Sequence, residues 1–174
     1  MAPARPVDEL AALTGWTGHA DAGSSWEEVE SALGLTLPAD VKELSERFPT
    51  GLFCSFVEIY APPEAFLAEA RDSLELLSEQ DDLPHPVHPA PGGLLPWAGT
   101  TEGHTLCWLT GDPDPDRWPV VFCDDEFERW GEYAGGAVAF LRDLMSGRFR
   151  HDLLDEHLEG CDPVFDQIQE MEAK

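Results

Sequence analysis

One stretch decides the fold that this sequence predicts, and from Pro91 to Asp125 it reads PGGLLPWAGTTEGHTLCWLTGDPDPDRWPVVFCDD. Two short apolar runs lie within it, at residues 104–109 and 118–125, and each is bounded by Gly, Pro or Asp. Runs of this length and content are typical of buried strands, and the Asp-Pro-Asp-Pro-Asp sequence between them is typical of a turn. We therefore expect a central antiparallel hairpin, with helices before and after it.

The flanking helices are predicted from apolar residues that recur at helical spacing. They are expected at residues 7–13, 26–33, 38–48, 63–77 and 137–146. Ser25 and Glu28 predict a capping box at the start of the second helix, and Gly34 is suited to end it. Pro38 is expected at the first position of the third helix. Residues 53–60 and 127–133 are each expected to form a further strand.

Helices, then strands, then helices predict an α+β fold: a single domain with a central antiparallel β-sheet flanked by helices. We expect a short helix and linker at residues 1–24, the main domain at 25–149, and an acidic helical tail at 150–174 that packs on it. The tail is expected to form one or two short helices. The predicted structural core contains Trp26, Leu33, Leu44, Trp97 and Trp108.

The charge of the chain is its most unusual property, because 35 acidic side chains stand against 10 basic ones, for a net charge of −25. Such a surface repels nucleic acid and anionic lipid, and it attracts basic partners most strongly at low salt. An equally open interpretation is that the charge only aids solubility. No apolar segment of signal-peptide or membrane-span type is found, so a cytoplasmic protein is expected.

Catalytic and metal-binding motifs are weak in this sequence. It contains neither Gly-x-Ser-x-Gly nor a Walker loop, and the apolar neighbours of Cys54 indicate an unreactive thiol. His151, Asp155, His157 and Cys161 lie close together in the sequence, but their spacing matches no common zinc site. We therefore expect no cofactor, no bound metal and no enzymatic activity.

Two acidic loops are the candidate partner-binding surface, one between the two apolar runs and one after the second run. The candidate residues are Asp112, Asp114, Asp116, Trp118, Asp124, Asp125, Glu126 and Glu128. Prolines stiffen the first loop, and a stiff anionic display beside tryptophan would suit an arginine-rich partner. The alternative is that Asp and Pro only perform turn chemistry there, which turn statistics favour for the first loop. Calcium is a weaker alternative, because the loop lacks the Gly and Glu of an EF-hand.

Two groups of residues resemble one known family. The opening pattern is WxxVExxLGxxLPxDxKxL at residues 26–44, followed by FPxG at 48–51. The later pattern is PGGLLPW at 91–97, then Gly103, Trp108, residues 114–118, Val120-Val121, and FLxxLxxG at 140–147. Together they resemble the SMI1/KNR4 family of the SUKH superfamily, in its actinobacterial branch, over residues 25–149.

The resemblance implies an α+β domain without an established catalytic site, so no catalytic residues carry over. Bacterial members of the family are read as immunity proteins that bind toxins, often nucleases, and fungal members as interaction scaffolds. The leading hypothesis is therefore a non-enzymatic protein-binding domain, an immunity protein whose acidic face covers a basic nuclease toxin. The alternatives are a scaffold or regulator of host proteins and, third, an unrecognised hydrolase or metal-binding protein. The identity of the partner and the oligomeric state stay open.

Overall fold

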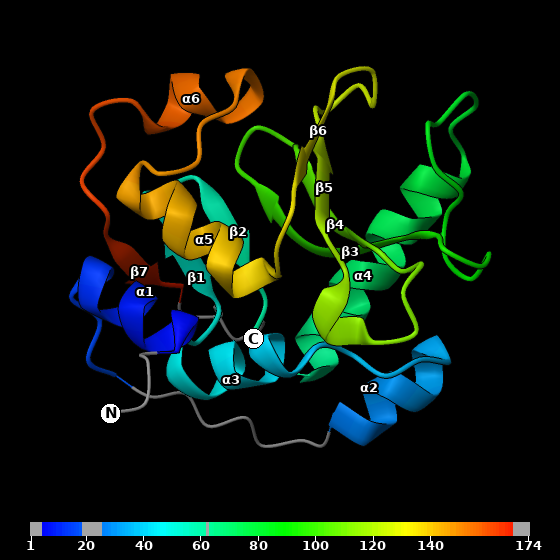
Figure 1. The fold of residues 1–174 in the computed structure, drawn as a ribbon, viewed down its shortest axis with the longest axis horizontal. Helices are drawn as coiled ribbons and strands as arrows, with labels where there is room; N and C mark the ends of the chain where they lie inside the picture. The colour runs from blue at the N-terminus through cyan, green and yellow to red at the C-terminus, as the bar shows by residue number, and fades with distance from the viewer. Residues whose placement is uncertain (1–4, 19–25, 62, 169–174) are drawn as a thin grey trace, which may run out of the picture.

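A seven-stranded antiparallel sheet forms the frame of the molecule in the computed structural model, which describes residues 5–18, 26–61 and 63–168 (Figure 1). Its strands are β1 Gly51–Phe53, β2 Val57–Ile59, β3 Leu94–Thr100, β4 Thr105–Leu109, β5 Val120–Cys123, β6 Trp130–Tyr133 and β7 Phe165–Gln167. Their order across the sheet is β6-β5-β4-β3-β2-β1-β7. Neighbours in sequence are therefore neighbours in space, except that β7 returns from the end of the chain to pair with β1.

The helices of the described chain surround this sheet and confirm the predicted α+β fold. They are α1 Pro6–Thr14, α2 Trp26–Leu33, α3 Ala39–Arg47, α4 Pro63–Ser78, α5 Ala137–Ser146, α6 Asp152–Leu158 and the 3₁₀ turn η1 Pro115–Arg117. Gly34 follows α2 with a φ of 76°, a left-handed conformation that glycine adopts without strain. Pro38 is the N-cap of α3 rather than its first helical residue. The predicted capping box depends on Ser25, which lies outside the described residues.

The predicted central hairpin is present as β4 and β5, in which Leu106 faces Phe122 and Trp108 faces Val120. The sequence did not mark the preceding segment as a strand, yet it forms β3, which pairs with β4 and bulges between Pro96 and Ala98. Proline cannot donate a backbone hydrogen bond to a neighbouring strand, so its presence argues against a strand. A β-bulge is a place where a sheet tolerates proline.

The single strand expected at residues 53–60 is interrupted, because Phe53 ends β1 and β2 covers only residues 57–59. A tight turn separates β1 from β2, and Cys54 and Ser55 adopt φ values of 55° and 56° in it. Because an aromatic and β-branched run favours an extended chain throughout, local propensity gave no signal for this reversal.

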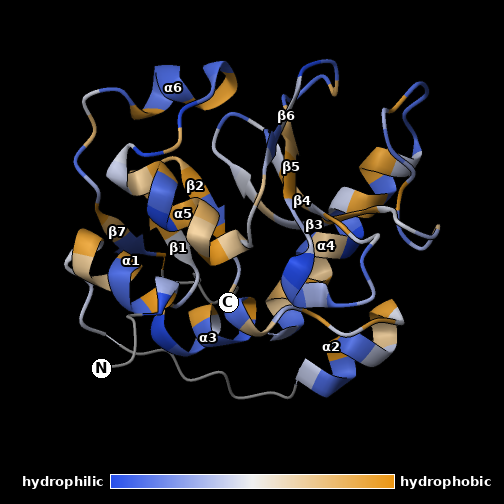
Figure 2. Cartoon of the chain, viewed as in Figure 1, coloured by the Kyte–Doolittle hydropathy of each residue, from blue (hydrophilic) through white to orange (hydrophobic). Residues whose placement is uncertain are grey.

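Alternating residues of the central strands enter two separate apolar clusters. Figure 2 shows that these strands are predominantly hydrophobic in sequence. Leu106, Trp108 and Phe122 belong to the main core, which also includes the inward faces of α1, α3 and α5. Cys107 and Val121 point the opposite way, into a small cluster with the last turn of α4. Successive side chains of a strand face opposite sides, so both faces of this part of the sheet are covered.

The first and last elements of the described chain both join the core. Val7, Leu10 and Ala11 of α1 are buried, so the short N-terminal helix packs with the main body. The tail is not entirely helical as predicted, because β7 adds an edge strand to the sheet. Phe165 explains this placement, since its ring lies 4.8 Å from that of Phe53 at the sheet edge. Such a long-range contact leaves no periodic pattern in the tail.

The residues expected in the core are not all equally buried. Leu33, Leu44, Trp97 and Trp108 are buried, and the two indole rings stack at a centroid distance of 6.0 Å. Trp26 is only partly buried: its Nε1 donates a hydrogen bond to Ser45 Oγ at 3.3 Å. It therefore lies at the rim of the core, with its indole N–H satisfied.

Candidate functional site: an acidic end and the cleft beside it

The two acidic loops lie at opposite ends of the sheet (Figure 1). The first joins the end of β4 to the start of β5, at residues 110–119, and the second follows β5 at residues 124–129. Because β4 and β5 are antiparallel, the chain crosses the whole sheet between the two loops. The eight candidate residues therefore do not form one surface.

The first loop is built around a tryptophan that is not available to a partner. Trp118 is only 4% exposed, and its ring lies 5.9 Å from that of Trp108 in the main core. Its indole Nε1 donates a hydrogen bond to the carbonyl oxygen of Asp112 at 2.8 Å. Burial of its large apolar surface thus corrects the expectation that Trp118 contributes to an exposed binding surface.

The aspartates of the first loop accept hydrogen bonds from backbone N–H groups. Asp112 Oδ1 accepts from the amide of Asp114 at 2.9 Å, and Asp114 Oδ1 accepts from that of Asp116 at 3.0 Å. Asp116 Oδ1 accepts from the amide of Ala39 at 2.8 Å, at the start of α3. These contacts are those of the turn-chemistry interpretation, and they fasten the loop to a helix.

The second loop uses one carboxylate in the same way and exposes the others. Asp124 Oδ1 accepts from the amides of Glu128 and Arg129, at 2.9 and 3.3 Å. Asp125, Glu126 and Glu128 are exposed, and their carboxylates make no hydrogen bond or ion pair within the described chain. These three charges therefore face solvent.

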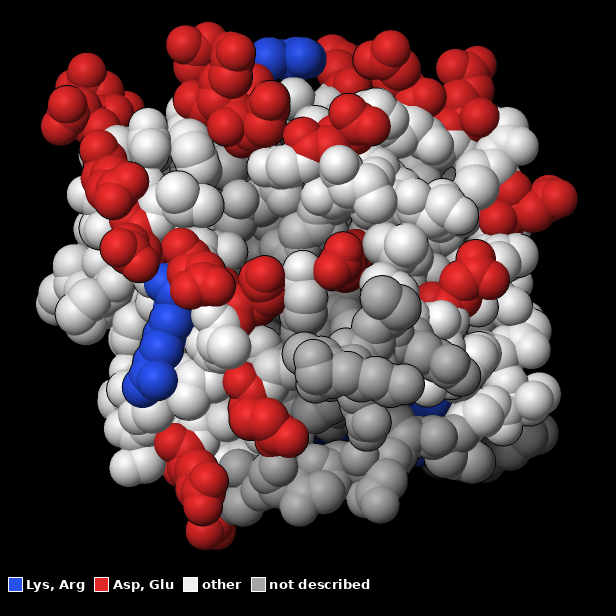
Figure 3. Space-filling view, turned by 180° about the vertical axis from the view of Figure 1, so that it is seen from behind, with Lys and Arg blue, Asp and Glu red and all other residues white. Residues whose placement is uncertain are grey.

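Further carboxylates gather at the same end of the sheet. Helix α6 lies there, because the His157 ring stacks on Phe56 at 4.6 Å and lies 6.1 Å from His104 in the β3–β4 turn. We call this surface the acidic end; its exposed residues are Glu102, Asp125, Glu126, Glu128, Asp152, Glu156 and Glu159. Figure 3 shows the corresponding red side chains along the upper edge of the molecule, with little blue among them.

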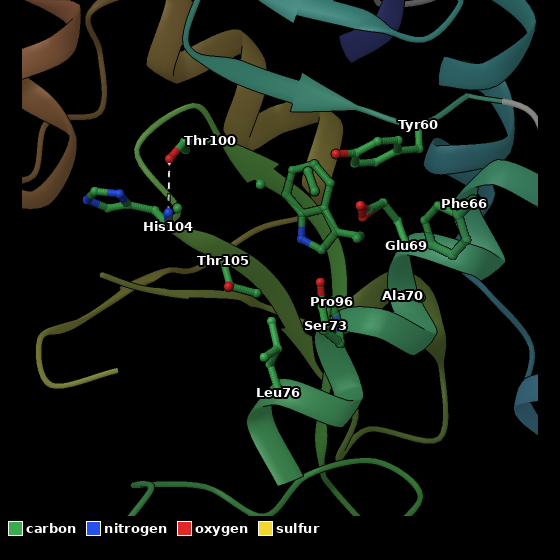
Figure 4. Close-up of a pocket in the computed structure, with 14 residues that line it drawn as sticks. Tyr60, Phe66, Glu69, Ala70, Ser73, Leu76, Pro96, Thr100, His104 and Thr105 are labelled. Carbon is green, nitrogen blue, oxygen red and sulfur yellow. Dashed lines mark hydrogen bonds between the residues drawn. The ribbon is translucent and has the colours of Figure 1, made fainter. Parts of the chain in front are cut away.

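A cleft of 220 Å³ opens beside the acidic end, between α4 and strands β3 and β4 (Figure 4). Tyr60, Phe66 and Trp97 give it aromatic walls, and Glu69 and Ser73 bring polar groups from α4. Gly103 and His104 of the β3–β4 turn also line it. Since that turn also carries Glu102, the cleft borders the acidic end.

The cleft raises the pKa of its acidic groups. Burial is the main cause of the raised pKa of Glu69, and the neighbouring charge of Asp72 adds to it. Burial likewise raises the pKa of the Tyr60 hydroxyl, helped by the carboxylate of Glu58. Burial lowers the pKa of His104, whose imidazole is therefore held neutral at neutral pH.

Two buried polar atoms that belong to cleft residues lack a hydrogen-bond partner within the described chain. They are the indole Nε1 of Trp97, a residue only 3% exposed, and the imidazole Nδ1 of His104. Buried polar groups are nearly always satisfied in folded proteins, so each such atom needs an explanation. The imidazole of His104 points away from the cleft, toward Phe56 and His157 (Figure 4), so a molecule in the cleft would not supply its partner.

The residues weighed for catalysis or metal binding have other contacts. Burial raises the pKa of Cys54 to about 11, the opposite of an activated thiol. His151 Nδ1 accepts from the amide of Leu153 at 3.2 Å, and Asp155 Oδ1 accepts from that of His151 at 2.9 Å, so both residues cap α6. Among the residues that the structure describes, no group of three His, Cys, Asp or Glu is placed to hold a metal ion.

None of the helices in the described ranges combines the length and the apolar character that crossing a membrane requires. No motif in the sequence indicates the cleft. Only the packing of α4 against β3 turns the carboxylate of Glu69 toward Tyr60 (Figure 4).

The α+β fold agrees with what comparison of the sequence finds. A family model described as SMI1-KNR4 cell-wall, SUKH_6, matches residues 24–134, more than half of the chain. The chain belongs to this family. Its members are protein-interaction and immunity-type domains that are generally non-enzymatic and are associated with protein partners such as toxins. No curated protein and no solved structure gives a significant match.

Proposed function

We propose that this protein is a non-enzymatic, cytoplasmic binding domain of the immunity type, and that it neutralises a nuclease-type toxin by covering the toxin's basic surface. The observation that carries the proposal is the acidic end, where the exposed carboxylates of two β-turns and α6 gather at one end of the sheet. Membership of a family of protein-interaction domains supports it.

The chemistry of the two partners is complementary. A nuclease must carry cationic groups to bind the phosphates of its substrate. A carboxylate-rich surface attracts those groups, speeds the encounter and competes with the nucleic acid for them. Of the candidate residues, Asp125, Glu126 and Glu128 are proposed as the binding charges, with Asp124 holding their turn in shape.

The first test is capture of a partner from lysate of the source cells at about 50 mM salt, followed by elution with rising salt. The expected result is a basic nuclease that is released as the salt concentration increases and that loses activity when the purified protein is added back. Capture of no basic protein, or of a nuclease that stays fully active in the saturated complex, would contradict the proposal. A captured host protein without nuclease activity would favour the scaffold alternative.

A matched pair of variants tests the surface. The acidic-end variant Asp125→Asn/Glu126→Gln/Glu128→Gln should bind the captured nuclease at least about tenfold more weakly at low salt, because it loses three steering charges. The control Glu46→Gln/Glu79→Gln/Asp166→Asn removes the same charge from exposed residues elsewhere and should bind nearly as well as the wild type. Equal weakening by both would mean that only net charge matters.

A further inference from the structure

We propose that the cleft beside the acidic end takes an arginine side chain of the basic partner. The inference rests on the proposed function for the source of that arginine, but the chemistry of the cleft can be tested without the partner. None of the fourteen residues that line the cleft is Lys or Arg, so a cation from outside would meet no positive charge there.

Glu69 is the anionic group that would pair with the guanidinium. Its carboxylate faces the Tyr60 side chain across the cleft (Figure 4), and no ion pair to a basic residue of the described chain is formed. Burial raises the pKa of this carboxyl, which means that its charged form is disfavoured. A bound guanidinium would remove this penalty, because it offers charge-assisted hydrogen bonds in a fixed fork.

The aromatic walls favour arginine over lysine. A planar guanidinium stacks on aromatic faces and is less strongly hydrated than an ammonium group. Of the aromatic residues that line the cleft, Phe66 and Trp97 are buried, so the half-buried Tyr60 is the ring that a guanidinium can reach. Ser73 and Thr105 add hydroxyl groups that can accept the remaining N–H donors. The cleft therefore matches both the flat apolar faces and the polar edge of arginine.

The two unpartnered atoms of the cleft residues are not part of the proposed contact. The imidazole of His104 points away from Tyr60 and Glu69 (Figure 4), toward the rings of Phe56 and His157. The indole Nε1 of Trp97 is buried, in a residue only 3% exposed, so it can report on the cleft without contacting the arginine.

The test is an NMR titration of the intact protein with N-acetyl-arginine amide, following the indole Nε1–H resonance of Trp97. A saturable shift in the millimolar range is expected, because a single side chain offers few contacts. The neutral citrulline analogue has nearly the same shape without the charge and should give no saturable shift. The lysine analogue should bind more weakly than the arginine probe.

Two variants on α4 assign the effect to the cleft. Glu69→Gln should weaken binding of the arginine probe about tenfold or more, the cost of losing a hydrogen bond to a charged group. Glu75→Gln changes an exposed carboxylate of the same helix outside the cleft and should leave binding unchanged. Both variants should unfold at or above the wild-type temperature, since neither removes a buried contact of the core.

Equal shifts with the citrulline analogue, stronger binding of the lysine analogue, or no effect of Glu69→Gln would overturn the inference. This failure is distinguishable from that of the proposed function. If a nuclease is bound and inhibited through the acidic end but the cleft does not bind the arginine probe, the proposed function stands and the arginine-binding cleft is refuted. The reverse result would leave an arginine-binding cleft without a toxin partner.

Discussion

The loop between β4 and β5 and the turn after β5 have similar acidic sequences but use their carboxylates differently. In the first, Asp112, Asp114 and Asp116 accept hydrogen bonds from backbone amides, and Trp118 is buried beneath them. In the second, Asp124 alone performs that role. The remaining carboxylates of the turn face solvent near α6 and the cleft. Acidic composition therefore does not identify a binding surface until the backbone partners of each carboxylate are known.

The largest effect that separates the two regions is expected from Trp118→Ala. Removing this buried indole leaves a cavity beside Trp108 and an unpaired carbonyl at Asp112, so the free energy of unfolding should fall by about 3–5 kcal/mol. Chemical denaturation measures the loss. Asp125→Ala in the other loop is the control and should change stability by no more than about 0.5 kcal/mol. Similar values for the two variants would contradict the structural role of the first loop.

Much of the fold was predictable because its determinants are local. The helix at residues 137–146 has the same bounds as α5, since a double glycine precedes it and Gly147 follows it with a φ of 80°. The β4–β5 hairpin was also predictable, from two apolar runs around a proline-rich turn. Strand β3 was not, because Pro96 lies inside it, and β7 was not, because it pairs with β1, which is distant in sequence.

The site was less predictable than the fold, for the same physical reason. The positions of the acidic residues are known from the sequence. Which carboxylate accepts a hydrogen bond from an amide of another element, as that of Asp116 does from Ala39, is not. Nor does the sequence place α6 beside the β3–β4 turn, a contact made by the rings of His157 and His104. The acidic end and the cleft are assembled by these tertiary contacts.

An intermediate effect is expected from Asp116, which joins the first loop to α3. Asp116→Ala leaves the amide of Ala39 without its acceptor and should lower the free energy of unfolding by about 1 kcal/mol, as for the loss of a helix cap. Asp116→Asn keeps an oxygen acceptor and should recover most of the loss. Denaturation of both variants gives the comparison. Equal destabilisation by Ala and Asn would indicate that charge, rather than the hydrogen bond, holds the loop.

The smallest expected effect concerns Asp40, whose pKa is raised by burial even though the amides of Val138 and Val41 partly offset it. The charge of Asp116 raises it further, so the first loop also acts through electrostatics. Below the ordinary range of an aspartate, about 3.9, the folded and unfolded states both hold the proton. As the pH rises above that range the unfolded state releases its proton first, so stability is lost until the pH passes the raised pKa of the folded state.

The variant Asp40→Asn isolates the contribution of Asp40 to the pH dependence of stability. The titration of the other carboxylates cancels when the free energy of unfolding of the variant is subtracted from that of the wild type. The difference should favour the wild type most at about pH 4 and shift toward the variant as the pH approaches about 7. Asn at this position retains an oxygen that can accept a hydrogen bond from the amide of Val138, as Asp40 Oδ2 does at 3.1 Å. A difference that is flat, or that rises with pH, would show that Asp40 titrates normally and that the first loop acts on α3 through its hydrogen bond alone.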